Sequence, residues 1–117
     1  EAVVDAQENQ KQNQVSNAQI ISGDVSKVLE EMYRYPSTKM PDCIFVDPPR
    51  SGLEQTGIDW LLKLVARRIV YISCCPETQQ RDARPLVAAG YRLTAIQPID
   101  QLPQTTHVEN IILFQKE

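Results

Sequence analysis

The chain has 117 residues, of which 12 are Lys or Arg and 15 are Asp or Glu, so its formal charge is −3 and its length fits one domain or part of one. No apolar run approaches the roughly 20 residues of a membrane-spanning helix, which excludes a membrane partner. Three cysteines cannot all pair within one chain and the start lacks a secretory signal pattern, so we expect a reducing, cytoplasmic setting. Basic side chains outnumber acidic ones over 48–95, which predicts either a phosphate-binding surface or solvated helix faces.

The first part of the chain predicts a helix, a strand and a second helix. Apolar residues at helical spacing indicate a helix over residues 1–14, and the short apolar run 18–22 indicates a strand. Gly23 and Asp24 then turn the chain into a helix over 25–35. Asp24 is well placed as the N-cap of that helix, because Asp side chains accept hydrogen bonds from the first free amides.

The second part repeats this alternation of strands and helices. Compact apolar runs predict strands and helical spacing predicts helices, at 43–46 (strand), 53–66 (helix), 68–73 (strand), 76–89 (helix), 91–96 (strand) and 108–114 (strand). Pro76 opens the second of these helices and Gly90 ends it. Strands without alternating polarity, separated by helices, predict an α/β fold with a mostly parallel sheet and helices on both faces.

Polar residues follow three of the predicted strands. They are Asp24, the loop 47–50, and Cys74 with Cys75. Ligands of parallel α/β sheets lie beyond the carboxyl ends of the strands. We therefore expect these three groups to meet at one rim of the sheet.

The segment Ser73-Cys74-Cys75-Pro76 places a cysteine close to a helix start. Pro76 suits the first helical position, which makes Cys75 the N-cap and puts Cys74 just before it. The positive end of a helix favours a thiolate, the form of cysteine that attacks electrophiles. The alternative is an inert buried cysteine, which is also the interpretation of Cys43. Zinc needs four ligands at recognisable spacing, which the two adjacent cysteines and His107 do not supply, so no metal site is predicted.

Two carboxylates are further candidates. Asp47 begins the loop Asp-Pro-Pro-Arg, whose two prolines fix φ, so the loop either holds a polar group for a ligand or simply ends the strand. Glu109 lies just inside the last predicted strand. There it is either an edge residue facing water or a partly buried carboxylate that can act as a base.

Three motifs occur together: DPPRSGLE at 47–54, IVYISCCPETQQRD at 69–82 and DQLPQTTHVENIILF at 100–114. In sequence and spacing they resemble the carboxyl-terminal part of the catalytic domain of the RNA uracil-5-methyltransferase family, and the resemblance extends over residues 1–117. It implies a truncated Rossmann-like class I methyltransferase fold with an antiparallel final strand. It also implies S-adenosyl-L-methionine as cofactor, and RNA as partner, with a uridine of tRNA or rRNA methylated at C5.

The resemblance also implies roles for individual residues. Cys74 matches the family's nucleophile, which adds to C6 of the uracil ring, and Glu109 matches the base that later removes the C5 proton. Asp47 matches the motif aspartate at the cofactor and target pocket. Asp24 resembles the residue that meets the adenine side of the cofactor, and Arg50 is expected to contact RNA or to position the site.

The sequence departs from the family pattern in two ways. The family usually reads Ser-Cys-Asn-Pro, and Cys75 here replaces an Asn that is the better N-cap, at a cost of about 1 kcal/mol. The glycine-rich cofactor turn and the RNA-binding part do not precede Glu1. We therefore expect a fragment that is inactive alone and binds the cofactor poorly. Its incomplete sheet is expected to be gapped, rearranged or completed by another chain, for example through self-association.

Two other functions fit the same motifs. One is a non-catalytic module that keeps the fold to bind RNA or a protein partner. The other is a methyltransferase that acts on an amino group, which uses a similar Asp-Pro-Pro loop at a strand end and needs no nucleophilic cysteine.

Overall fold

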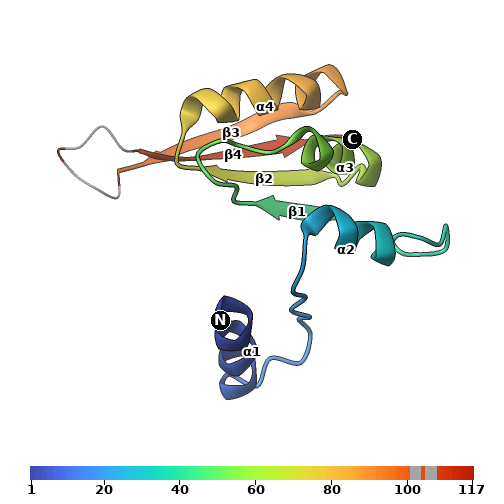
Figure 1. Cartoon of the computed structure of the whole chain (residues 1–117). Helices are drawn as coiled ribbons and strands as arrows, with labels where there is room; N and C mark the ends of the chain where they lie inside the picture. Colours follow the sequence, from blue (N-terminus) through green and yellow to red (C-terminus); the bar gives the residue numbers. More distant parts are fainter. Residues whose placement is uncertain (101–103, 105–107) are drawn as a thin grey trace. The chain divides into compact units, whose positions relative to one another are not determined.

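The computed structural model describes residues 1–100, 104 and 108–117, and these divide into two compact units, Glu1–Pro36 and Ser37–Glu117 (Figure 1). The first unit contains helices α1 (Ala2–Gln12) and α2 (Val25–Met32). Asp24 caps α2 as predicted, because its Oδ1 accepts a hydrogen bond from the Lys27 amide at 3.1 Å. None of the described helices is long and apolar enough to cross a membrane.

The strand predicted over 18–22 is wrong. These residues adopt no regular structure, and Ile21 is 43% exposed. A strand needs a neighbour for its N–H and C=O groups, and the described strands pair only with one another. The apolar run therefore gives the right composition for a strand but has no partner in the described residues.

The second unit holds the remaining elements: β1 (Cys43–Val46), α3 (Gln55–Leu64), β2 (Arg68–Ser73), α4 (Pro76–Ala88), β3 (Arg92–Ile99) and β4 (Glu109–Gln115). These confirm the predicted elements, with small differences at the ends. The α3 helix stops at Leu64 because Val65 takes a left-handed conformation with φ 50°. Strand β3 continues past the predicted end to Ile99, with an irregular register between Leu93 and Ala95.

The sheet has the order β1-β2-β4-β3, with one parallel pair and two antiparallel pairs. The prediction of a mostly parallel sheet is therefore wrong. Strands β1, β2 and β3 do run in one direction, as strands joined by helices tend to do. The last strand, however, lies between β2 and β3 and runs opposite to both, so two of the three pairings become antiparallel.

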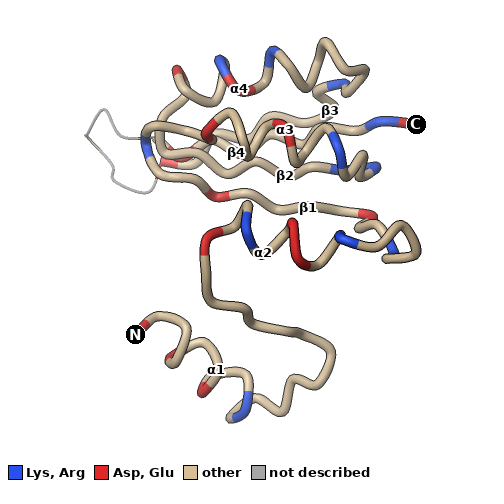
Figure 2. The backbone as a smooth tube through the Cα atoms, turned by 45° about the vertical axis from the view of Figure 1, so that its right-hand side comes forward, with Lys and Arg blue, Asp and Glu red and all other residues tan. Residues whose placement is uncertain are grey.

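Both helices of this unit cover the same face of the sheet, and Figures 1 and 2 show them on one side of the strands. The core joins side chains from α3, α4, β2, β4 and the residue just before β3, namely Leu61, Ile69, Tyr71, Ala83, Leu86, Tyr91, Ile112 and Phe114. On the other face, Phe45 is 71% exposed. Helices on both faces of the sheet were predicted, but the helices described within Ser37–Glu117 cover only one face (Figure 1).

Candidate active site

Three of the predicted site residues come to one rim of the sheet. Strands β1 and β2 are parallel neighbours, so Asp47 and Cys74 follow their carboxyl ends at the same edge. Strand β4 runs the other way and begins at that edge with Glu109. Ser73 pairs with Asn110, so Cys74 and Glu109 are the next residue on each strand beyond this pair.

Asp24 lies in the unit Glu1–Pro36 and follows no strand, because residues 18–22 do not form one. Its Oδ1 serves as the cap of α2. The prediction that Asp24 shares a strand-end position with the other two groups is therefore wrong in its structural premise.

The backbone beside Cys74 is held by the side chain of Ser73. The Ser73 hydroxyl accepts a hydrogen bond from the Cys75 amide and lies at the same 2.9 Å from the Cys75 carbonyl, to which it donates. Helix α4 begins at Pro76 as predicted, with Cys75 at the N-cap. The Cys74 side chain is half-buried just before this helix start.

Cys75 does not replace the missing Asn as a helix cap. Its side chain makes no capping hydrogen bond, and its thiol instead donates to a Glu77 carboxylate oxygen at 3.2 Å. Cys75 is buried, unlike its neighbour Cys74. The two adjacent thiols therefore lie in different environments, with only one of them reachable in part from solvent.

The loop that starts at Asp47 is fixed from the side of α4. Asp47 and Arg50 are exposed, while the Gly52 amide donates to the Pro49 carbonyl at 2.9 Å and closes a turn. The Thr78 hydroxyl donates to the Arg50 carbonyl at 2.8 Å. The rim therefore presents the Asp47 carboxylate on a loop whose backbone is tied to the helix that follows Cys74.

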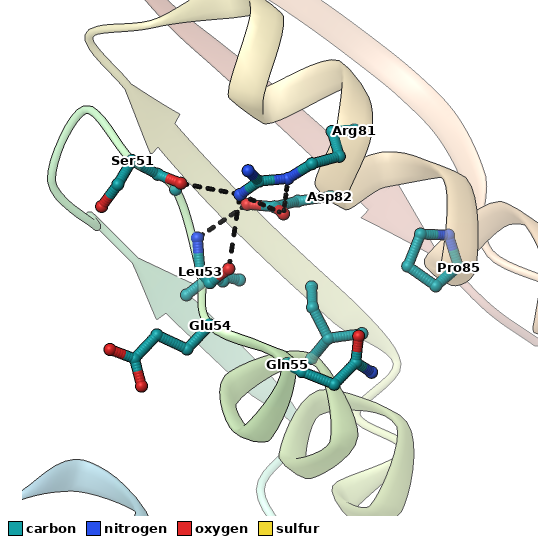
Figure 3. A pocket seen from close by; sticks show the side chains of 9 residues that line it. Ser51, Leu53, Glu54, Gln55, Arg81, Asp82 and Pro85 are labelled. Atoms are coloured by element: carbon teal, nitrogen blue, oxygen red, sulfur yellow. Dashed lines mark hydrogen bonds and ion pairs between the residues drawn. The ribbon is translucent and has the colours of Figure 1, made fainter.

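A buried carboxylate ties the far end of the same loop. One oxygen of Asp82, which is 3% exposed, accepts hydrogen bonds from the Leu53 amide at 2.7 Å and the Tyr71 hydroxyl at 2.6 Å. Its other oxygen accepts from the Arg81 guanidinium, which also donates to the Ser51 carbonyl at 2.7 Å (Figure 3). Burial, and then the hydrogen bond to Asp82, raise the pKa of Tyr71 well above its ordinary value. Tyr71 thus stays protonated and donates.

This cluster also lines an open cleft of about 780 Å³ between the start of α3 and α4. Two polar residues of its lining are already engaged, because Arg81 and Asp82 bind each other and the loop backbone (Figure 3). Asp47, Cys74 and Glu109 do not line it. The cleft is therefore separate from the rim.

Gly52 allows the close approach between the loop and α4. Its φ is +79°, and a Cβ there would lie 2.6 Å from the Asp82 Oδ2 and 2.7 Å from the Arg81 Nη2. Both the left-handed backbone and the lack of space favour glycine. Gly52 was not predicted as a site residue, although it stands within the motif DPPRSGLE.

A second buried polar contact joins β2, β4 and α4. The Gln79 side-chain amide donates to the Tyr71 carbonyl at 3.1 Å and to the Asn110 carbonyl at 3.2 Å, and its oxygen accepts from the Asn110 side chain at 2.8 Å. Gln79 and Asp82 were also overlooked. Their signal was present in the sequence, because positions 79, 82, 83 and 86 share one face of a helix and the last two are apolar.

Among the residues that the structure describes, no group of three His, Cys, Asp or Glu side chains is placed to hold a metal ion. His107, which the sequence analysis weighed as a ligand, lies outside the described residues.

The known proteins that this chain resembles in sequence are RNA methyltransferases. The chain is 52% identical to an uncharacterized RNA methyltransferase of Protochlamydia amoebophila over 97% of its length, and 47% identical to one of Staphylococcus aureus over the same share. It covers 26% and 24% of these two proteins. The chain thus spans about a quarter of the length of the curated relatives that it matches.

A solved structure shows the same fold. It is that of the Pyrococcus abyssi tRNA (uracil-54, C5)-methyltransferase in complex with S-adenosyl-L-homocysteine, with a TM-score of 0.75 and 34% identity. The match covers 97% of this chain and 26% of that one. The α/β fold is therefore that of an S-adenosylmethionine-dependent methyltransferase.

A family model identifies the family to which the chain belongs. The family model described as tRNA (uracil-5-)-methyltransferase matches residues 1–117. The chain belongs to this family.

Proposed function

We propose that the protein that carries this chain transfers a methyl group from S-adenosyl-L-methionine to C5 of a uridine in tRNA or rRNA, through a covalent adduct with Cys74. In this proposal residues 1–117 are the carboxyl-terminal portion of the catalytic domain and are inactive alone. The observation that carries it is the strand register: Ser73 pairs with Asn110, and Cys74 and Glu109 both lie just beyond this pair, at one rim of the sheet. A nucleophile and a base that act on adjacent ring carbons need such proximity.

The chemistry requires both side chains. C5 of uracil is a weak nucleophile, so the Cys74 thiolate first forms a bond to C6, and the electron pair of the C5–C6 double bond shifts onto the C4 carbonyl oxygen through C5. S-adenosyl-L-methionine supplies the methyl group that C5 receives. Glu109 then takes the C5 proton, the C–H electron pair restores the double bond, and the C6–S bond breaks to release the thiolate.

The carboxylate of Asp47 is suited to the cofactor. It is exposed at the rim on a loop stiffened by two prolines and fixed through Thr78, and it can accept hydrogen bonds from amino or hydroxyl groups. We assign it to cofactor binding. Asp24, which resembles the family residue on the adenine side, is also assigned to the cofactor, in addition to its role as the cap of α2. The exposed Arg50, three residues after Asp47, is assigned to RNA contact because its guanidinium suits phosphate.

RNA that contains 5-fluorouridine tests this proposal. Fluorine at C5 cannot leave as a proton, so the full-length protein with cofactor is expected to form a covalent RNA adduct that survives denaturing electrophoresis. The adduct should disappear in Cys74→Ser and remain in the matched control Cys75→Ser. An adduct that persists in Cys74→Ser, or that is lost only in Cys75→Ser, contradicts the assignment.

A further inference from the structure

Gln79 is a polar side chain in a position that packing alone would give to an apolar one. It is 1% exposed, in the first turn of α4, and the buried residues further along the same helix face include Ala83 and Leu86. Burying an amide without hydrogen bonds destabilises a folded protein. A methionine of similar length would fill the space without that risk, so the amide itself has a use here.

The hydrogen-bond partners of the Gln79 side chain show what the amide does. Gln79 Nε2 donates to the carbonyls of Tyr71 on β2 and Asn110 on β4, and the Asn110 side chain donates back to Gln79 Oε1. These contacts tie together two strands and a helix. The backbone pairing of β2 with β4 ends at Ser73 and Asn110. Gln79 holds Asn110 of this last pair directly and holds β2 at Tyr71, two residues before Ser73.

Cys74 and Glu109 lie directly beyond this last pair. Glu109 is the neighbour of Asn110, and Cys74 is separated from Tyr71 by two residues. The Ser73 hydroxyl fixes the turn on the cysteine side. The start of β4 has its side-chain contact with the helix through Asn110 and Gln79. A shift of β4 relative to β2 would therefore move Glu109 away from Cys74.

We propose that Gln79 is a positioning residue, which acts through Asn110 to hold Glu109 in place over the ring bound to Cys74. This inference rests on the proposed function. It assigns Gln79 to the second half of the reaction, in which the C5 proton leaves and the C6–S bond breaks. Formation of that bond depends on Cys74, and the turn beside Cys74 is held by the Ser73 hydroxyl, without Gln79.

The test compares Gln79→Met with Gln80→Met in the full-length protein. Gln80 is the exposed neighbour on the same helix, so its change is the matched control. In a single turnover on uridine RNA with cofactor, Gln79→Met is expected to raise the RNA found covalently bound to protein about ten-fold, because a misplacement of about 1 Å can slow a step by up to about 100-fold. Gln80→Met should match the unmodified protein, and adduct yield on 5-fluorouridine RNA should stay unchanged in both.

A purely structural role predicts another pattern. If Gln79→Met lowers methyl transfer and adduct yield together on both RNAs, or changes neither, the inference is overturned. Asn110→Ser is a second variant that leaves the buried Gln79 in place and removes only the hydrogen bond from the Asn110 side chain to Gln79 Oε1. It should also accumulate adduct on uridine RNA. No accumulation in this variant also overturns the inference. Failure of the unmodified protein to form any adduct with 5-fluorouridine RNA instead overturns the proposed function.

Discussion

Asp82 is a buried carboxylate whose ionised form has a donor for each oxygen. The Tyr71 hydroxyl and Leu53 amide bind one oxygen, and the Arg81 guanidinium binds the other. The charge is therefore compensated at short range, which makes its burial tolerable. The arrangement joins the loop after Asp47 to the helix after Cys74, so the geometry of the rim depends on it.

Tyr71→Phe is expected to destabilise the protein by about 1–3 kcal/mol near neutral pH, because it removes a buried hydrogen bond to a charged acceptor. The raised pKa of Tyr71 also makes wild-type stability depend on pH. The folded state keeps a proton that the unfolded chain loses near pH 10, so this contribution is complete below about pH 10 and is lost as the pH rises above it.

Thermal unfolding of the two proteins at pH 8 and above pH 10 measures this effect. The difference in melting temperature should shrink at the higher pH. Tyr35→Phe is the control, because Tyr35 is 66% exposed, and it should change the melting temperature at neither pH. A Tyr71→Phe difference that stays constant or grows with pH would refute the linkage.

The lack of a side chain at Gly52 can be tested by substitution. In Gly52→Ala the new methyl group meets Asp82 and Arg81 at distances that real Cβ atoms do not adopt, and the left-handed φ adds strain. We expect amide hydrogen exchange to accelerate over 50–53 and at the start of α4. Gly57→Ala is the matched control, since a Cβ there meets only Leu53 at 3.5 Å, in ordinary contact. Equal exchange in both variants would show that the close approach is unimportant.

At the scale of an element, the start of α4 is open to improvement. The N-cap residue Cys75 makes no capping hydrogen bond, and Asn is among the best residues at this position. Cys75→Asn is expected to stabilise the helix by about 1 kcal/mol and to slow amide exchange in its first turn. Cys75→Ala, which also lacks a cap, separates this effect from loss of the thiol. Unchanged or faster exchange in the Asn variant would contradict the capping argument.

The elements that the sequence predicts well are those with local signals at both ends. Pro76 and Gly90 bound α4, and the β-branched run 68–73 is β2 to the residue. The run 18–22 has the composition of a strand, yet pairing is a property of two segments and no local pattern supplies the partner. The same limit explains the sheet: the position of β4 between β2 and β3 is a long-range choice.

Some residues of the candidate site could be predicted from the sequence and others could not. Cys74, Asp47 and Glu109 carry reactive groups in recognisable motifs, so the sequence could nominate them. Gln79 and Asp82 resemble ordinary polar helix residues in sequence, and only the burial of their helix face distinguishes them. Their roles depend on partners about 30 positions away along the chain, Asn110 and Leu53 respectively, which no local pattern specifies.

At the scale of the whole molecule, the unit Ser37–Glu117 is a sheet with one covered face. Side chains at alternate positions of β1 show this clearly: Ile44 and Val46 pack against the core, whereas Phe45 between them is exposed. The chain spans about a quarter of the length of its curated relatives, and its rim carries the proposed nucleophile and base. The decisive experiment is therefore made on the full-length protein of the proposed function.

The roles proposed for Cys74 and Glu109 are tested by the fate of the adduct when the carboxylate of Glu109 is removed. In Glu109→Gln, ordinary uridine RNA and labelled cofactor should give a protein–RNA adduct that contains the transferred methyl group, persists on denaturing electrophoresis and requires Cys74. The unmodified protein should release methylated RNA instead. Normal release of methylated RNA by Glu109→Gln, or an adduct that still forms after Cys74→Ser, would contradict the claim that these two residues act on one uracil ring.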